Sequence, residues 1–301
     1  LLVIIVLWCE VKTHWRWLLL LGLALYGWRL TGLSIDYVEN YRRVLRNFYG
    51  QLRVADANEG TLGTRRMIVH GRINHGEQFI APAYSRRPTA YYCEQSGIGQ
   101  ALLGLRDRPA LKLGVLGLGA GTLSTYGRPG DEMRMYEINE QVLDLARNDF
   151  SYLAESRAHI VPVLGDGRLM LEREPVQNFD LLAIDAFSGD SIPTHLLTLE
   201  AMQAYLRHLK SDGILAVHIT NRYLDLRPVI KTAADHFKRP VRIVDFDGDA
   251  ERGLFRSRWA IIAADDTFFC HEGFEDSRLL PDRPGFKAWL DDYSSLFAVL
   301  M

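Results

Sequence analysis

The feature that most constrains the fold is a regular alternation of strand-like and helical stretches, which begins after Pro88. Short apolar runs bounded by turn residues are typical of buried strands, and periodic stretches between them are typical of helices. Such alternation predicts an α/β fold, in which helices cover both faces of a parallel sheet. Ligands bind these sheets outside the carboxyl ends of the strands, so polar residues at those ends are the functional candidates.

Seven strands of this sheet are expected from the sequence. They cover 113–118, 133–137, 160–164, 179–185, 213–219, 241–245 and 259–263, and the clearest helices cover 140–149 and 199–209. The first strand runs directly into the turn GLGAGT, whose glycines are Gly117, Gly119 and Gly121. Glycines let the backbone turn sharply and approach a ligand closely, although a tight packing turn uses the same residues. The pattern predicts a Rossmann-like, nucleoside-binding domain.

Two acidic residues end the next two strands. Glu137 follows the second strand, where a carboxylate can accept hydrogen bonds from both hydroxyls of a ribose. Asp166, followed by Gly167, ends the third strand, where an acceptor for an adenine amino group would lie. An acidic anchor after the third strand, such as Asp166, is not expected in NAD-binding folds, so the arrangement favours S-adenosylmethionine (AdoMet). A solvated strand end and an ordinary Asp-Gly turn are the structural alternatives.

The loop after the fourth strand is the most informative segment for chemistry. It reads DAFSGDSIPTH, begins with Asp185 and contains Asp190. A cationic amine beside the partly buried Asp185 would keep this carboxylate ionised, and Asp185 could accept a proton from that amine. Asp190 would hold a second positive charge, or it would cap the turn before Pro193.

The N-terminal residues 1–33 differ in composition from the rest of the chain. Two apolar runs, 1–8 and 17–28, are separated by a polar stretch, and the second run reaches a span of about 20 residues only if it extends to Leu33. Trp17 and Trp28 flank this run, as is typical at membrane interfaces. We therefore expect one or two membrane segments; a buried helical hairpin is the alternative.

The segments that follow complete the domain organisation. Residues 34–47 have helical spacing and are expected to form a linker helix, residues 48–87 alternate like a small β-domain, and residues 88–301 form the Rossmann-like domain. Arg29, Arg42, Arg43 and Arg46 lie on the globular side of the apolar runs. They favour a cell-membrane protein whose catalytic domain is cytoplasmic, although basic residues in the preceding polar stretch weaken this asymmetry.

Composition argues against several other classes of protein. The net charge of -2 lacks the basic excess of a nucleic-acid-binding protein. Cys9, Cys93 and Cys270 are far apart, and the histidines match no standard zinc spacing, so no metal site is predicted.

Taken together and in order, the motifs from about Phe48 to Ala263 resemble those of the spermidine synthase family. The matching segments are NFYGQLRV, HGRINHGEQF, YYCEQSGIG, GLGAGT, YEIN, GDGR, DAFSGDSIPTHLLT and GILAVHITNRYLDL. The likeness is greatest to members fused to a membrane region. It implies a small β-domain before a Rossmann-like AdoMet-type transferase domain, and often a homodimer. The implied reaction moves an aminopropyl group from decarboxylated AdoMet to a polyamine such as putrescine, without a metal.

The resemblance also assigns roles to residues. It implies that Asp185 is the base that deprotonates the amine and that Glu137 and Asp166 hold ribose and adenine. The candidate substrate contacts in or beside the matching segments are Asp190, Tyr49, Asn74, Tyr92 and Tyr223.

Departures from the family pattern leave other functions open. Ala120 stands where the family carries an Asp that helps to hold the aminopropyl amine, and the family's Tyr-Gln pair appears as Tyr49-Gly50. Asn74 stands in place of a Gln, and Arg222 would pair naturally with the carboxylate of intact AdoMet. An AdoMet-dependent methyltransferase is therefore the second hypothesis. A non-catalytic domain that senses polyamine or nucleoside for a membrane protein is the third.

Overall fold

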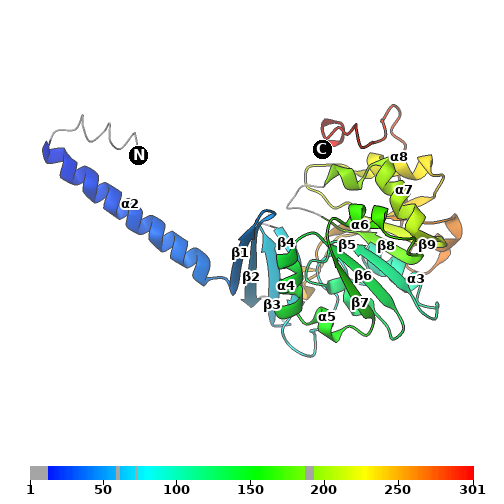
Figure 1. Cartoon of the computed structure of the whole chain (residues 1–301), viewed down its shortest axis with the longest axis horizontal. Helices are drawn as coiled ribbons and strands as arrows, with labels where there is room; N and C mark the ends of the chain where they lie inside the picture. The colour runs from blue at the N-terminus through cyan, green and yellow to red at the C-terminus, as the bar shows by residue number, and fades with distance from the viewer. Residues whose placement is uncertain (1–12, 59–61, 72, 187–192) are drawn as a thin grey trace. The chain divides into compact units, whose positions relative to one another are not determined.

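The computed structural model describes residues 13–58, 62–71, 73–186 and 193–301. The chain forms two compact units, Leu1–Val44 and Leu45–Met301 (Figure 1). Asp190 lies outside the described residues, as do the whole first apolar run, 1–8, and residues 9–12 of the polar stretch that follows it.

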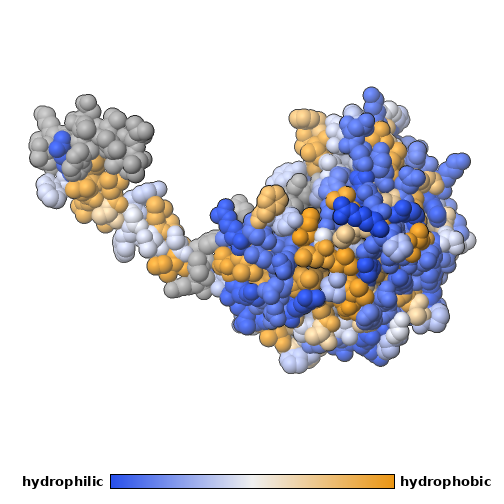
Figure 2. Space-filling model, in the orientation of Figure 1, coloured by the Kyte–Doolittle hydropathy of each residue, from blue (hydrophilic) through white to orange (hydrophobic). Residues whose placement is uncertain are grey.

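In the part of the first unit that the structure describes, residues 13–39 form one long helix, α2 (Thr13–Glu39). Its segment Trp15–Ile35 has 21 residues, a mean hydropathy of 1.5 and no buried side chains in the tested window. Figure 2 shows patches of hydrophobic residues along this helix. The expected interfacial residues Trp17 and Trp28 are 74% and 75% exposed. The helix is long and apolar enough to cross a membrane, a criterion that signal sequences and core helices can also meet.

The expected linker helix over 34–47 is wrong in its second half. The helix ends at Glu39, and Arg43–Asn47 forms the strand β1. The spacing of apolar residues fits a helix locally, but β1 belongs to a four-stranded sheet with the order β1-β2-β3-β4. Pairing with a neighbouring strand therefore overrides the weaker local helical preference.

The expected small β-domain is a meander within this sheet. Its strands β2 (Gly50–Asn58), β3 (Thr64–His70) and β4 (Ile73–Phe79) are antiparallel. Leu52, Val54 and Ile68 face inward and form one apolar cluster with Leu145, Phe150 and Tyr152 of the large domain. The meander is therefore packed against the domain that carries the glycine-rich turn.

The large domain is built on an eight-stranded sheet with the order β12-β10-β11-β9-β8-β5-β6-β7. The strands are β5 (Lys112–Leu116), β6 (Glu132–Glu137), β7 (His159–Leu164), β8 (Phe179–Ile184), β9 (Leu209–His218), β10 (Val241–Phe246), β11 (Ser257–Ile262) and β12 (Arg278–Leu279). All seven expected strands are present, with ends shifted by a few residues.

The expectation of a wholly parallel sheet is wrong at one edge. Strands β5 to β9 pair in parallel, but β11 is antiparallel to both β9 and β10, and β12 is antiparallel to β10. The connection from β10 to β11 is too short for the helical crossover that parallel neighbours need. As a result, the amino end of β11 lies at the same sheet edge as the carboxyl ends of β8 and β9.

Helices cover both faces of this sheet (Figure 1). They are α3 (Gly97–Gly104), α4 (Glu140–Asn148), α5 (Tyr152–Glu155), α6 (Gly167–Arg173), α7 (Leu199–His208) and α8 (Arg227–His236). Short 3₁₀ turns are η1 (Thr122–Tyr126), η2 (Thr194–Leu196), η3 (Ala250–Arg252), η4 (Asp266–Cys270) and η5 (Phe297–Val299). Leu182 and Ile184 of β8 pack in the cluster with α7 and α8, and Leu181 and Ala183 pack in the cluster with α3 and α4. This alternation is what a strand buried on both faces requires.

Candidate active site

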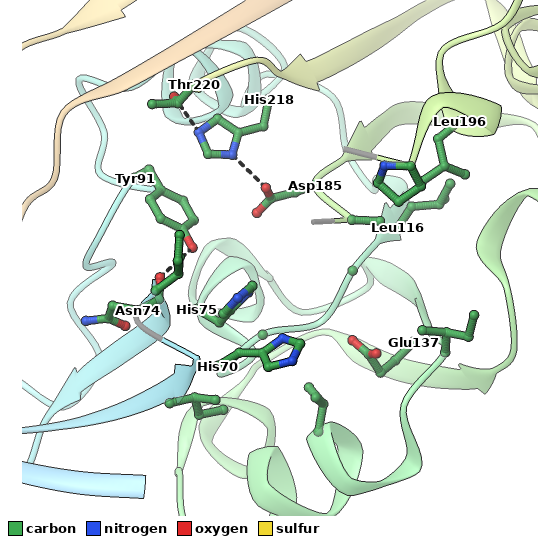
Figure 3. Close-up of a pocket in the computed structure, with 18 of the residues that line it drawn as sticks. His70, Asn74, His75, Tyr91, Leu116, Glu137, Asp185, Leu196, His218 and Thr220 are labelled. Atoms are coloured by element: carbon green, nitrogen blue, oxygen red, sulfur yellow. Dashed lines mark hydrogen bonds and ion pairs between the residues drawn. The ribbon is translucent and has the colours of Figure 1, made fainter. Parts of the chain in front are cut away.

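A cavity of about 1130 Å³ opens at the carboxyl edge of the parallel strands. Residues from the ends of β5, β6, β8 and β9, the turn after β7, the β3–β4 hairpin and the start of β11 line it (Figure 3). The predicted residues that line it are Tyr49, Asn74, Tyr92, Gly117, Gly119, Glu137, Asp166, Gly167 and Asp185. The structure therefore brings together residues that are far apart in the sequence.

The glycine-rich turn after β5 packs too closely for larger residues. Gly117 has φ of 94°, and a Cβ there would lie 2.2 Å from the carbonyl oxygen of Asp185. Gly121, also predicted to bind the nucleoside, is the N-cap of η1 and packs against Leu153 instead of lining the cavity. The φ of 85° and the contact with Leu153 both require glycine at this position.

The Glu137 carboxylate is fixed by backbone donors. Its Oε1 accepts from the N–H of Asn139 at 2.8 Å, and its Oε2 accepts from the N–H of Leu118 at 3.0 Å. Burial raises the pKa of Glu137, and these hydrogen bonds oppose the shift. Each oxygen keeps a further lone pair, so the carboxylate can still accept hydrogen bonds from two ligand hydroxyls.

Asp166 lines the cavity but is engaged in local contacts. Its Oδ1 caps α6 by accepting from the N–H of Leu169 at 2.9 Å, and its Oδ2 lies 3.1 Å from Nε2 of His195. The hydrogen bond from His195 is the main cause of the lowered pKa of Asp166. A contact to an adenine amino group would use the lone pairs that remain.

Asp185 lies at the centre of the polar network in the cavity. Its side chain is 5% exposed, and its Oδ1 lies 2.6 Å from Nδ1 of His218. The hydroxyl of Tyr92 donates to Oδ2. Burial is the main cause that raises the pKa of Tyr92 well above its usual value, so this phenol is a donor and not an anion. Tyr92 was predicted as a substrate contact, and its described partner is the carboxylate.

His218 is the site residue that sequence reasoning missed. By sequence it stands only among the histidines whose spacing fits no standard zinc site, without a link to Asp185. Strands β8 and β9 are parallel neighbours, so residues just beyond Ile184 and Val217 meet at the sheet edge. His218 follows Val217 as Asp185 follows Ile184. If β8 and β9 are taken as neighbours, these equivalent positions predict that His218 lies beside Asp185.

The remaining predicted substrate contacts differ in position. Asn74 lines the cavity, accepts from the N–H of Gly76 at 2.9 Å and donates to Glu77 at 3.0 Å. Tyr49 lies at the wall of the cavity and is 38% exposed. Tyr223 is 58% exposed and does not line the cavity.

Other charged or titratable residues line the same cavity. His75 has a pKa lowered to about 4, chiefly by burial, and its Nε2 has no hydrogen-bond partner in the described part of the chain. Arg222 and Arg256 line the cavity near the ends of β9 and β11, and neither forms an ion pair with a residue that the structure describes. In the described ranges, no cluster of three or more His, Cys, Asp or Glu residues could hold a metal ion.

Comparison with known sequences gives one informative relative. No model of a known protein family matches the chain. The chain is 28% identical over 109 residues to a polyamine aminopropyltransferase from Vibrio vulnificus (strain CMCP6). This match covers 35% of the chain and 36% of the relative, so it spans about a third of the relative's length.

Comparison with solved structures gives several spermidine synthases. A probable spermidine synthase from Corynebacterium glutamicum ATCC 13032 has a TM-score of 0.57 and 17% identity, over 73% of this chain and 79% of that one. The spermidine synthase of Thermotoga maritima has a TM-score of 0.52 and 17% identity, over 75% and 73% of the two chains. A spermidine synthase solved with the transition-state analogue AdoDATO has a TM-score of 0.50 and 14% identity, over 81% and 80%.

These structural likenesses confirm the predicted α/β fold with a Rossmann-like sheet. Together with the relative from Vibrio vulnificus, they confirm the predicted resemblance to the spermidine synthase family. The names of these proteins are those of group-transferring enzymes, in agreement with the predicted enzyme class. The membrane-fused subgroup stays a prediction.

Proposed function

We propose that this protein is a spermidine synthase-like transferase that moves an aminopropyl group from decarboxylated AdoMet to an amine. The observation that carries the proposal is the Asp185 carboxylate, buried at the end of β8 beside the glycine-rich turn. The reference acceptor is a polyamine such as putrescine, by analogy with the polyamine aminopropyltransferase that the chain resembles. A cavity of about 1130 Å³ is large enough for a nucleoside and a short amine together.

The residues around the cavity fit a nucleoside donor. Gly117 lets the glycine-rich turn pack directly against the backbone of Asp185, where a Cβ would collide, and so holds the turn beside this carboxylate at the cavity. Glu137 is fixed by two backbone donors in an orientation that leaves lone pairs for ribose hydroxyls. The bound donor would supply an activated methylene beside a sulfonium.

The proposed chemistry needs one proton acceptor. Asp185 takes a proton from the ammonium of the acceptor, and the free nitrogen lone pair attacks the methylene beside the sulfonium. A C–N bond forms, the C–S bond breaks, and its electron pair neutralises the sulfonium to give methylthioadenosine. Alignment of the two substrates and this proton transfer supply the rate enhancement.

The test is Asp185→Asn in the full-length chain. Asparagine keeps the shape of the side chain but cannot take the proton, so turnover should fall by about 10²- to 10⁴-fold. The affinity for methylthioadenosine should stay within about twofold, because the amide stands outside the proposed nucleoside contacts. Asp212→Asn, an exposed carboxylate paired with Arg108, is the matched control. Wild-type turnover by Asp185→Asn would refute the proposed role.

A second candidate uses intact AdoMet, as a methyltransferase does. Arg222 and Arg256 favour it, because a guanidinium that forms no ion pair with the described residues suits a ligand carboxylate. The small Ala120 side chain, which packs near Gly76, also removes any carboxylate from the turn. Under this candidate, Arg222→Gln should weaken binding of AdoMet but not of its decarboxylated form, and the product would be S-adenosylhomocysteine. If the protein binds a nucleoside but turns over no amine, the third hypothesis, a domain that senses polyamine or nucleoside, would be favoured.

We also propose that α2 anchors the protein in a cell membrane with the catalytic domain in the cytoplasm. The length and hydropathy of Trp15–Ile35 support the anchor. Arginines that follow Leu33, such as Arg42, Arg43 and Arg46, support the orientation. Basic residues next to a membrane span are enriched on its cytoplasmic side.

A further inference from the structure

The imidazole of His218 is held on four sides. Its Nδ1 lies 2.6 Å from Oδ1 of Asp185, and its Nε2 lies 2.7 Å from Oγ1 of Thr220 (Figure 3). The indole of Trp259 stacks on the ring at 4.7 Å with an angle of 20° between the planes. The ring of Tyr91 packs against it at 4.7 Å. The side chain of His218 is 5% exposed, so these contacts surround most of the ring.

The surrounding hydrogen bonds assign the tautomer of His218. The N–H of Arg258 donates to Oγ1 of Thr220 at 2.7 Å, so the threonine must direct its own hydrogen elsewhere. One acceptor, the carbonyl oxygen of Arg258, is 3.5 Å away, whereas Nε2 of His218 is 2.7 Å away. The hydroxyl therefore donates to Nε2, and the ring hydrogen stands on Nδ1, where it is donated to Asp185.

Asp185 is consequently held by two donors, one on each oxygen. Tyr92 donates to Oδ2 and His218 donates to Oδ1. A carboxylate with both oxygens bonded cannot rotate about its last side-chain bond without losing both bonds. The lone pairs that remain on its oxygens then point in fixed directions, which is what a base needs to meet the amine proton in one geometry.

Packing alone does not account for a histidine at this position. Trp259 and Tyr91 would accept a phenyl ring between them, and an apolar ring carries no polar atoms that must be satisfied. The imidazole instead uses both ring nitrogens, and one of its two bonds goes to the carboxylate that the reaction is proposed to use.

We propose that His218 is a positioning residue for the transfer reaction, which orients the Asp185 carboxylate toward the acceptor amine. Thr220 supports it by fixing the tautomer that donates from Nδ1. This role rests on the proposed function of Asp185, and nothing in the resemblance assigns it.

The experiment compares His218→Asn with His218→Phe in the full-length chain. The Nδ2 of asparagine is separated from the backbone by the same bonds as Nδ1 of histidine, so His218→Asn keeps the donor but loses the ring. His218→Phe keeps the ring between Trp259 and Tyr91 but loses the donor. For each variant, kcat and KM are measured for the amine and the donor substrate, with the Kd of methylthioadenosine.

The proposal predicts that His218→Phe lowers kcat by about 100-fold with little change in KM or in the Kd of methylthioadenosine. His218→Asn should keep kcat within about tenfold of wild type, as a rescue by the retained donor. Equal losses of kcat in the two variants would overturn the proposal, because the ring and not the donor would then matter. Unchanged kcat in His218→Phe would also overturn it.

Two further measurements keep the test decisive. If His218→Phe does not fold, Thr220→Val replaces it, with Thr220→Ser as control; the proposal expects a severalfold lower kcat for the valine variant alone. An unchanged kcat for valine would contradict it. If wild-type protein binds methylthioadenosine but turns over no amine, the proposed function fails first, and the role of His218 falls with it.

Discussion

The carbonyl oxygen of His75 lies 2.5 Å from the place where a Cβ on Gly119 would stand. One residue later, the Cβ built on Gly76 would lie 2.9 Å from the Cβ of Ala120. The backbone of β4 is thus pressed directly onto the glycine-rich turn. Because β4 packs directly against the glycine-rich turn, the small sheet forms one wall of the active site.

Gly119→Ala should disturb this wall. The new Cβ collides with the backbone of His75, and φ at this position is 52°, in the left-handed region that favours glycine. We expect a loss of stability of about 1–3 kcal/mol and a loss of affinity for methylthioadenosine of at least about tenfold. Thermal unfolding and calorimetric titration measure the two effects.

Gly130→Ala is the matched control for this variant. Gly130 also has a positive φ, of 92°, but a Cβ there would meet only Ala110, at 3.9 Å. It should lose a similar amount of stability through backbone strain but keep its affinity. Equal affinity in Gly119→Ala and wild type would show that the wall does not shape the nucleoside site.

His75 should make stability depend on pH. Its pKa is lowered from 6.5 to about 4 in the folded chain, so between these values the unfolded chain binds the proton and the folded chain does not. The free energy of unfolding should therefore fall as pH decreases through this window, by at most about 3 kcal/mol from this residue. Above pH 6.5 the contribution is constant.

Urea unfolding of wild type and His75→Gln between pH 7 and 4 measures this contribution. The carboxylates contribute equally to both proteins, so the difference in slope belongs to His75. Identical pH dependence in the two proteins would mean that His75 is not buried as a neutral ring.

The pair formed by Arg168 and Asp291 should stabilise the C-terminal segment. Both terminal nitrogens of Arg168 lie 2.6 Å from the two carboxylate oxygens of Asp291, and the pKa of Arg168 is raised chiefly by this contact. Asp291→Asn should lower the free energy of unfolding by about 1–3 kcal/mol, as expected for a bidentate charged pair with one partner buried.

Asp282→Asn provides the comparison, because Asp282 pairs with Lys231 but its side chain is 79% exposed. We expect a change below about 1 kcal/mol there. Chemical denaturation of the two variants distinguishes them. A smaller effect at Asp291 than at Asp282 would contradict this account.

The membrane anchor predicts where the protein is found in a cell. The full-length chain should sediment with membranes, and replacing Leu21 and Leu23 with Arg should release it or prevent its insertion. Each charged residue near the centre of a span costs about 2.5–3.5 kcal/mol of insertion free energy. The control replaces Phe297 and Leu300, which are exposed on the globular unit, with Arg. These substitutions should leave the protein in the membrane fraction. A wild-type chain in the soluble fraction would refute the anchor.

The sequence was most informative where strands end. Glu137, Asp166 and Asp185 each follow a strong apolar run, and parallel neighbours bring their carboxyl ends to one edge, so both the fold and these positions could be predicted. The turn glycines were predictable for the same reason, although Gly121 serves packing and not the cavity.

What the sequence did not reveal depends on tertiary pairing. Residues 43–47 fit a helix by spacing, and only a neighbouring strand makes them β1. The short connection between β10 and β11 makes β11 antiparallel, and no local sequence pattern encodes this direction. The antiparallel direction brings Arg256, which precedes β11, to the site. The bond from His218 to Asp185 likewise requires that β9 lie beside β8.

The most direct test of the account is the release of methylthioadenosine by the full-length protein from decarboxylated AdoMet, with and without putrescine. We predict release that depends on the amine and that Asp185→Asn lowers by at least about 100-fold, while Asp212→Asn releases as much as wild type. Release of S-adenosylhomocysteine from intact AdoMet, with no methylthioadenosine from the decarboxylated form, would contradict aminopropyl transfer.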